Sequence, residues 1–304
     1  MIAILMPTCD KYEWVAKITL KWLRHYWKDH PPVYVCGAHS FSGEQSLAFT
    51  CDPRDWIGIA WEAVSYLEDQ GFTYCYLVLD DHPPVGSCNT EFLNIILPQL
   101  AQQLDAVQVS LSGWDQFRPS QGRVLGRENC YLMENDSNFR WSFNLHPGLW
   151  KVASLQRILE TLKEEGTPQW SARDFEARVR SLQSNRQDMR EHSAYRICAD
   201  KYAVGNRWFQ GSIKRKIIVQ FIHLFRLVGF CLGGNRLRGK IDKKIRVYQD
   251  YLNGPYPMYW SGLMSKGRVH GNMIRFLQLI HDSAFLQTIK SAVESRREDK
   301  AGSL

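Results

Sequence analysis

Two aspartates and a histidine, Asp80, Asp81 and His82, directly follow the apolar run 74–79. Adjacent carboxylates at the end of a buried strand repel each other, and burial disfavours their charged forms unless something compensates them. Carboxylate oxygens on a loop suit Mg²⁺ or Mn²⁺, which bridges to the phosphate oxygens of a substrate. The stretch therefore predicts a divalent-metal site at Asp80 and Asp81, with His82 as a further ligand.

Each of these residues also has a purely structural explanation. One aspartate could cap the following segment while the other is solvated at a turn before Pro83. His82 could close that turn through a hydrogen bond instead of completing a metal shell. The spacing by itself does not distinguish a metal site from a turn.

The first 110 residues alternate short apolar runs with amphipathic stretches, which is typical of β-α-β units around a mostly parallel sheet. Strands are predicted over 2–7, 32–37, 74–81 and 106–111, and helices over 13–27, 55–71 and 89–104. Asp55 and Gly71 suit the start and the end of the second helix, and the third is expected to tolerate Pro98 or to kink there. The predicted fold class is α/β, a Rossmann-like sheet flanked by helices.

Ligands of such open sheets bind at the carboxyl ends of the strands. Pro7, Thr8 and Asp10 follow the first predicted strand, and the acidic pair follows the strand that ends near residue 80. We therefore expect these two groups of residues to lie on the same rim of the sheet.

The rest of the chain is less regular. Residues 112–150 are loop-rich, a helix is predicted over 151–166, and a polar helical region covers 171–192. Residues 201–250 hold 12 Lys or Arg against two Asp, a local charge of +10 within a chain whose formal charge is +7. The chain is accordingly divided into residues 1–200, with the sheet, and residues 201–304, a basic and mainly helical region.

Part of this basic region, residues 212–234, places a Lys/Arg cluster before an apolar stretch. A helix here has a broad apolar face flanked by cations, a pattern typical of helices that lie on an anionic membrane surface. A core helix with a basic rim is the alternative. Residues 212–246 thus predict a membrane-surface contact, whereas the chain has no recognised nucleic-acid-binding motif, so nucleic acid is not an expected partner.

Composition and cysteine spacing place the chain among ordinary globular proteins, with 44% hydrophobic and 23% charged residues. The eight cysteines form no C-x-x-C pair and show no zinc spacing, which indicates free thiols in a reducing compartment. The first residues do not resemble a signal peptide, and no stretch reaches the roughly 18 uninterrupted apolar residues of a membrane span. The expected location is cytoplasmic, or peripheral at the inner face of a membrane.

The acidic pair follows an apolar run and comes roughly 70 to 80 residues after an N-terminal strand that ends in Pro7-Thr8. In this position it resembles the metal-binding element of nucleotide-sugar-dependent glycosyltransferases of the GT-A fold. The resemblance is stronger to a bacterial branch concerned with surface polysaccharides, in which this strand ends in Glu-Asp. It implies a nucleoside-diphosphate sugar as donor and Mn²⁺ or Mg²⁺ as cofactor. Here the pair is Asp80-Asp81, and the residues after it depart from the family pattern.

Two segments at the donor side follow the same family. The loop 6–12 resembles the one that holds the nucleotide, which implies donor contacts from Pro7, Thr8 and Asp10. The segment 255–271 resembles a closing Gly-x-x-x-Lys-Gly loop, which implies that Lys266 and Arg268 reach the diphosphate.

Two segments at the acceptor side complete the resemblance. Residues 143–159 resemble an acceptor-side segment in which an extended piece ends in Trp and a helix follows. Within it, His146 precedes Pro147-Gly148 and could contact donor phosphate or acceptor, or else fix the loop. Residues 167–179 resemble the stretch that carries the general base, either Asp174 or Glu176. These two are two positions apart on a predicted helix, so only one can act, and Asp174 is slightly preferred. Both could instead belong to a solvated helix start.

The resemblance implies an inverting glycosyltransferase that moves a sugar to a glycan or lipid-linked acceptor with the help of a metal ion. One alternative is a nucleotidyltransferase, which would usually carry a Gly-rich, Lys/Arg-containing loop after its first strand; residues 6–14 contain no glycine. A second alternative is a non-catalytic protein on a transferase-like fold that binds a membrane or a polyanion.

Overall fold

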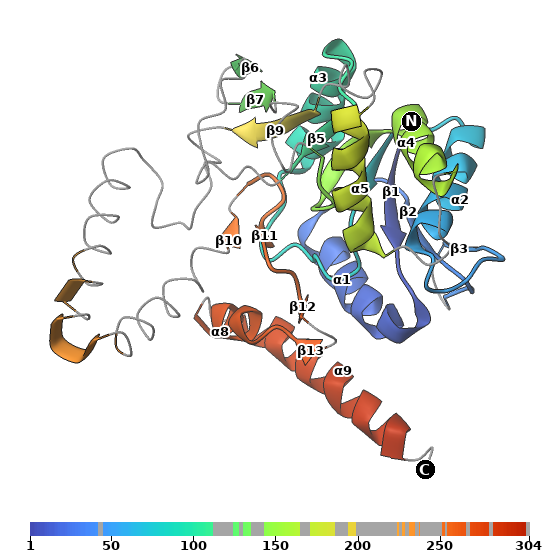
Figure 1. The fold of residues 1–304 in the computed structure, drawn as a ribbon. Helices are drawn as coiled ribbons and strands as arrows, with labels where there is room; N and C mark the ends of the chain where they lie inside the picture. Colours follow the sequence, from blue (N-terminus) through green and yellow to red (C-terminus); the bar gives the residue numbers. More distant parts are fainter. Residues whose placement is uncertain are drawn as a thin grey trace.

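The computed structural model shows an α/β protein (Figure 1). It describes residues 1–41, 45–111, 124–127, 130–134, 143–164, 171–185, 194–198, 224, 227–228, 231–234, 237, 251–252, 254–265, 268–279 and 282–301. None of the described helices combines the length and the apolar character that crossing a membrane requires.

One mixed sheet organises the described part of the chain, with nine strands in the order β3-β2-β1-β4-β8-β5-β9-β7-β6. Their bounds are Ile2–Pro7 (β1), Val33–Gly37 (β2), Ser46–Ala48 (β3), Tyr74–Leu77 (β4), Gln108–Ser110 (β5), Val124–Arg127 (β6), Cys130–Glu134 (β7), Gly148–Lys151 (β8) and Ala194–Cys198 (β9). Within this sheet, β8 and β7 run against the other strands. The sheet is therefore mostly parallel.

The central strand β1 pairs in parallel with β2 on one side and with β4 on the other. Its residues are apolar without interruption, as expected for a strand that is covered on both faces. Ile4 and Met6 belong to one hydrophobic cluster, and Ala3 and Leu5 to another. The strand thus separates the two main cores of the protein.

Helices cover both faces of the sheet. One core includes side chains of α1 (Glu13–Tyr26) and α3 (Leu97–Gln103), and the other includes side chains of α2 (Trp56–Asp69), α4 (Val152–Glu164) and α5 (Ala172–Asn185). This arrangement confirms the predicted fold class in its α/β, mostly parallel and helix-flanked character.

The third predicted helix contains a π-helical turn, η2 (Phe92–Ile96), directly before α3. Pro98 lies in the first turn of α3. Proline has no N–H to donate to the preceding turn, so it is tolerated in the first turn of a helix. The sequence-based expectation of an irregular helix here is confirmed.

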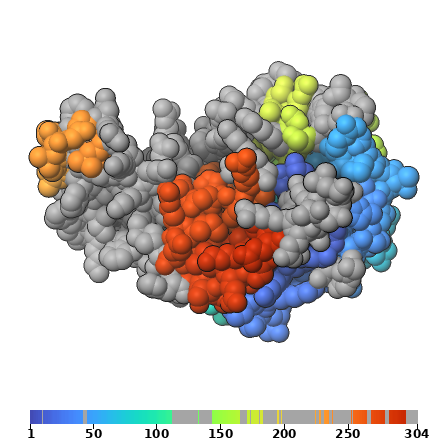
Figure 2. Space-filling model, turned by 90° about the horizontal axis from the view of Figure 1, so that it is seen from below, coloured from blue at the N-terminus to red at the C-terminus, as the bar shows by residue number. Residues whose placement is uncertain are grey.

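The C-terminal elements pack against α1 and form a third apolar cluster. They are the short strands β10 (Tyr251–Leu252), β11 (Met258–Tyr259), β12 (Met264–Ser265) and β13 (Arg268–Val269), followed by α8 (Gly271–Leu279) and α9 (Ser283–Ala301). Val15, Ile18 and Trp22 of α1 share this cluster with Phe285 and Ile289 of α9. In Figure 2 the red C-terminal surface borders the blue N-terminal surface.

Several strands depart from the sequence-based boundaries. β4 ends at Leu77, so the acidic pair lies beyond the strand rather than in it. Sequence analysis did not predict β3 or β8, and β8 occupies part of a region that was expected to be loop-rich. The predicted domain boundary at residue 200 lies outside the described residues, as does most of the segment 212–246.

Asp55 caps α2, because its Oδ1 accepts a hydrogen bond of 3.0 Å from the backbone N–H of Gly58. We expect Asp55→Ala to lower the free energy of unfolding by about 1 kcal/mol, the usual contribution of such a cap. Urea denaturation measures the change. Asp69→Ala is the control, since Asp69 ends the same helix, where a negative charge is unfavourable. Equal losses for the two variants would contradict the capping role.

Candidate active site at the ends of β1 and β4

The acidic pair lies in a tight turn at the carboxyl end of β4. The backbone N–H of His82 donates to the carbonyl of Leu79 at 3.1 Å, so Asp80 and Asp81 are the two central residues of the turn. β4 is adjacent to β1, and the chain runs from β1 to β2 toward one edge of the sheet and from β4 to β5 toward the other. Such a reversal of strand order is where open α/β sheets bind ligands.

Thr8 connects the two strand ends. Its hydroxyl donates to Oδ2 of Asp80 at 2.7 Å, and its backbone N–H donates to the carbonyl of Cys36 at the end of β2. Thr19 of α1 donates its hydroxyl to the backbone carbonyl of Asp80. The prediction that Pro7–Thr8 and the acidic pair share one rim is confirmed.

The charge of Asp80 is poorly compensated within the chain. Burial, together with the negative charge of Asp81, raises the pKa of the Asp80 carboxyl to about 7, although the Thr8 hydroxyl and the charge of His82 act in the opposite direction. The carboxyl is therefore partly protonated near neutral pH. A cation beside it would favour the charged form.

His82 lies between two acceptors. Its Nδ1 lies 2.7 Å from Oδ1 of Asp81, and its Nε2 lies 3.3 Å from the carbonyl oxygen of Trp260. Burial lowers the pKa of His82, but the charge of Asp81, its hydrogen bond and the Trp260 carbonyl together raise it above the ordinary value.

The contacts of the two ring nitrogens affect the prediction that His82 is a metal ligand. A histidine binds a metal through a nitrogen lone pair, and here both ring nitrogens already lie against oxygen atoms of the protein. The geometry therefore favours the alternative role of His82, a hydrogen-bonded closure of the turn.

A C-terminal segment, residues 254–265, fixes the acidic turn from the other side. The N–H of Leu263 donates to the carbonyl of Asp81 at 2.5 Å, and the hydroxyl of Tyr256 donates to the carbonyl of His82 at 2.8 Å. Sequence reasoning did not identify Tyr256 or Trp260, because their contribution depends on contacts between residues far apart in the chain.

His146 lies against the same Trp260. Its Nε2 is 3.2 Å from the Trp260 carbonyl oxygen, and the two rings stack with centroids 3.6 Å apart. Burial, and to a smaller extent the charge of His82, lower the pKa of His146 to about 3, so the ring is neutral. Since Nε2 donates to the carbonyl, Nδ1 is a bare acceptor, and it is buried without a hydrogen-bond partner among the described residues.

Buried polar side chains hold the loop that carries His146. Oδ1 of Asn144 accepts from the N–H of His146 at 3.2 Å, and the carbonyl of Asn144 accepts from the Gln108 amide at 2.6 Å. Sequence analysis missed both. Gln108 lies within a predicted strand whose other residues, apart from Ser110, are apolar, and a large polar residue in such a run is a signal that could have been used.

The two candidates for the general base are in different environments. Asp174 is exposed, and its Oδ2 accepts from both the N–H and the hydroxyl of Ser171, so it stabilises the start of α5. Glu176 is half-buried and its Oε1 accepts from the N–H of Leu145 at 2.9 Å. Burial raises the pKa of Glu176, while the Leu145 N–H and the charge of His82 lower it. Glu176 therefore contacts the loop that carries His146.

The remaining predicted donor contacts are less well placed. Asp10 begins the short 3₁₀ helix η1 (Asp10–Tyr12), but its side chain lies outside the described residues. Lys266 also lies outside them. Arg268 is exposed in the hairpin strand β13. Their roles remain predictions.

The fit of a divalent metal depends on two carboxylates. Among the described residues no three His, Cys, Asp or Glu side chains converge to hold an ion. The Thr8 hydroxyl contacts Oδ2 of Asp80, the ring of His82 contacts Oδ1 of Asp81, and a backbone N–H also contacts the Asp80 carboxyl. Each carboxylate oxygen has two lone pairs, so these contacts leave acceptor capacity for a metal ion. Mg²⁺ is often bound by one or two carboxylates plus substrate phosphates, and the pair fits an ion of that kind.

No protein-family model matches the chain, and no curated protein matches it. Among solved structures, mannose-1-phosphate geranyltransferase from Thermus thermophilus is 14% identical over 58% of this chain and 67% of its own, with a TM-score of 0.31. A fragment of TarS from S. aureus is 11% identical over 82% of this chain and 70% of its own, with a TM-score of 0.37. Similarity at this level identifies neither a family nor a reaction.

Gly262 lies against the acidic turn with a φ of +67°, and a Cβ there would be 2.9 Å from Oδ2 of Asp81. We expect Gly262→Ala to lower the free energy of unfolding by about 1 to 2 kcal/mol, because a side chain disfavours the left-handed conformation and displaces Asp81. Urea denaturation measures the loss.

Gly271→Ala is the matched control for this change, because a Cβ at Gly271 has no neighbour within 4 Å. It should leave the free energy of unfolding unchanged or raise it, since alanine is the better helix former at the start of α8. Similar losses in both variants would show that contact with the acidic turn is not the cause.

Proposed function

We propose that the protein is a metal-assisted glycosyltransferase that uses a nucleoside-diphosphate sugar. The observation that carries the proposal is the hydrogen bond between Thr8 and Asp80, which brings the predicted nucleotide loop and the acidic pair together at the reversal of strand order. This is the position at which α/β sheets bind nucleotides. The GT-A-like order of motifs in the sequence supports the same function.

The proposed cofactor is Mn²⁺ or Mg²⁺, held by Asp80 and Asp81. When bound, it supplies positive charge for a departing nucleoside diphosphate. The chain contributes the carboxylate oxygens of these two residues, and the Thr8 and His82 contacts hold both carboxylates in place. With two protein ligands, strong ion binding requires the substrate diphosphate as well.

Glu176 is the proposed general base, in place of the slightly preferred Asp174. It lies close enough to His82 for the charge of that ring to affect its pKa, and it contacts the His146 loop. Its raised pKa makes its carboxylate a stronger proton acceptor for an acceptor hydroxyl. Asp174 is engaged by Ser171 at an exposed helix start.

The proposed acceptor is a glycan or a lipid-linked sugar at the inner face of a membrane. Exposed apolar side chains recur at helical spacing in the basic region, at Leu224, Leu227, Val228 and Leu232. Residues three, four and eight apart share one helix face. Together with the local charge of +10 over residues 201–250, this face supports a peripheral contact with anionic lipid.

The metal requirement gives a direct test by thermal shift. With metal removed by chelation and then restored, UDP or GDP with Mn²⁺ should raise the melting temperature, whereas Mn²⁺ alone should have little effect. Ligand at about 100 times its Kd stabilises by about 2.7 kcal/mol. Asp81→Asn should abolish the metal-dependent rise in melting temperature. Asp69→Asn, which makes the same change at an exposed position, should retain it.

The same experiment separates the alternatives. Absence of stabilisation by every nucleoside diphosphate would favour the non-catalytic binding protein. Pyrophosphate release from a nucleoside triphosphate and a sugar phosphate would identify a nucleotidyltransferase, and release of a nucleoside diphosphate from a nucleotide sugar would support glycosyl transfer.

The choice of base is tested with the nucleotide sugar that stabilises the protein, by following nucleoside diphosphate release. Glu176→Gln should lower kcat by about a hundredfold or more, the contribution of a general base. Activity of the unmodified protein should fall as pH decreases through a pKa above 4.5, because the base acts only when deprotonated and burial raises its pKa. Asp174→Asn is the matched control and should keep its turnover; a comparable loss there would contradict the assignment.

A further inference from the structure

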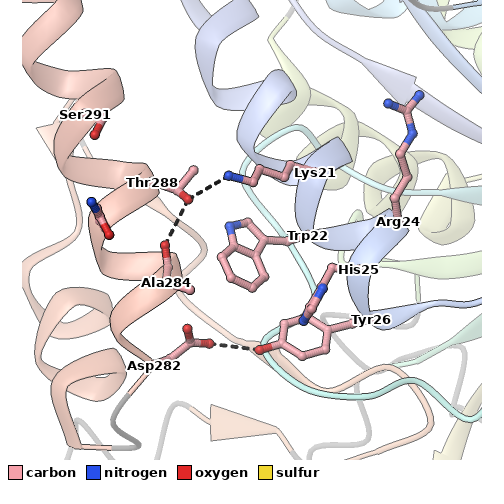
Figure 3. Close-up of a pocket in the computed structure, with 10 residues that line it drawn as sticks. Lys21, Trp22, Arg24, His25, Tyr26, Asp282, Ala284, Thr288 and Ser291 are labelled. Carbon is pink, nitrogen blue, oxygen red and sulfur yellow. Dashed lines mark hydrogen bonds between the residues drawn. The ribbon is translucent and has the colours of Figure 1, made fainter.

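A cavity of about 770 Å³ lies between α1 and α9, and none of its lining residues belongs to the candidate active site. Thr19 of α1 contacts Asp80, whereas Lys21, Trp22 and Tyr26 of the same helix extend toward α9 (Figure 3). The cavity is thus a second, separate concave surface built on α1.

Specific contacts hold the two walls of this cavity together. The ammonium group of Lys21 donates to the hydroxyl of Thr288 at 3.1 Å, and the hydroxyl of Tyr26 donates to Oδ2 of Asp282 at 2.9 Å. Between these bonds the ring of Trp22 packs against Phe285, with centroids 4.2 Å apart. The cavity therefore belongs to an ordered helix–helix packing.

The groups that line the cavity offer more hydrogen-bond donors than acceptors. Asp282 is the one carboxylate among the lining residues, and both of its oxygens are engaged, by Tyr26 and by the backbone N–H of Phe285. Lys21 and Arg24 contribute two permanent positive charges. Lys21 has three N–H groups, of which the Thr288 contact uses one. The lining therefore favours an anionic ligand with acceptor oxygens.

Trp22 adds an independent indication of a ligand. The residue is 4% exposed, and its indole N–H is buried without a hydrogen-bond partner within the described part of the chain. Leaving such a donor unpaired disfavours the folded state. In Figure 3 the ring nitrogen is on the side of the indole nearer Lys21. One acceptor oxygen could therefore receive hydrogen bonds from both side chains.

We propose that this cavity binds the phosphate group of a sugar phosphate. A phosphate group is negatively charged, and its oxygens form strong charge-assisted hydrogen bonds with lysine and arginine. Binding moves the flexible Lys21 ammonium from Thr288 to the phosphate, beside the indole N–H. The site is additional to the proposed transferase function and does not depend on it.

The size and the remaining lining of the cavity indicate a ligand larger than a free phosphate ion. Its volume lies within the roughly 300 to 1,000 Å³ of small-molecule sites, well above the needs of a phosphate ion. Gln287, Thr288 and Ser291 add amide and hydroxyl groups from α9, which can pair with sugar hydroxyls. These groups favour a polar sugar as the carrier of the phosphate.

The test uses the indole N–H signals of the ¹⁵N-labelled full chain. Trp22→Phe identifies the Trp22 signal among those of the 11 tryptophans. Titration with glucose 6-phosphate should move this signal downfield to saturation, because the N–H gains an acceptor. Inorganic phosphate should act more weakly, and glucose should have no effect.

Two lysine variants complete the test. Lys21→Ala should weaken glucose 6-phosphate binding about tenfold or more, the effect of losing a charged hydrogen bond. Lys17→Ala should leave it unchanged, because Lys17 pairs with Glu13 and does not line the cavity. The proposed site would be wrong if the Trp22 indole signal does not shift during the titration, or if Lys21→Ala binds glucose 6-phosphate as strongly as the unmodified protein does. Equal binding of inorganic phosphate and glucose 6-phosphate would overturn the sugar assignment.

Discussion

Two adjacent carboxylates just beyond the carboxyl end of the internal strand β4 impose the main electrostatic constraint on this protein. Neither can move away from the other, because the turn Leu79–His82 fixes their backbone. The chain offsets their charge with the Thr8 hydroxyl and the His82 ring, and both contacts require β1, β4 and the C-terminal segment to be in place. This compensation is incomplete at Asp80, where the pKa remains raised.

The Trp260 carbonyl is the point at which the two halves of the site meet. It lies within hydrogen-bond distance of both His82 and the neutral His146, whose rings lie 5.2 Å apart. Two histidines on one carbonyl would be unfavourable if both were charged, and the opposite pKa shifts avoid this repulsion. The backbone of the C-terminal region is therefore part of the electrostatics of the acidic turn.

Local patterns in the sequence were sufficient to predict the central strands and helices of the fold. The continuous apolar run of β1 and the periodicity of α1 and α2 predict these elements, and the rule for strand ends places Thr8 beside Asp80. The four residues of β8 have no comparable pattern, since their pairing with β4 and β5 depends on tertiary context. The Trp260 contact is made by a backbone carbonyl, which side-chain chemistry does not reveal.

The choice between Asp174 and Glu176 shows a signal in the sequence that was present but not used. Ser171 and Asp174 have the spacing of a capping box, which assigns Asp174 to the helix start. The burial of Glu176 and its contact with Leu145 come from the packing of α5 against the His146 loop, and no local pattern contains that information.

The contact between His82 and Trp260 joins residues 178 positions apart. Closing so long a loop has a large entropic cost and is expected late in folding, after local β-α-β units have formed. The sheet can thus assemble while the acidic turn still lacks its C-terminal partner. Local opening of residues 254–265 would release the same contact without unfolding the sheet, so the geometry around Asp81 is governed by the stability of that segment rather than by the stability of the whole protein.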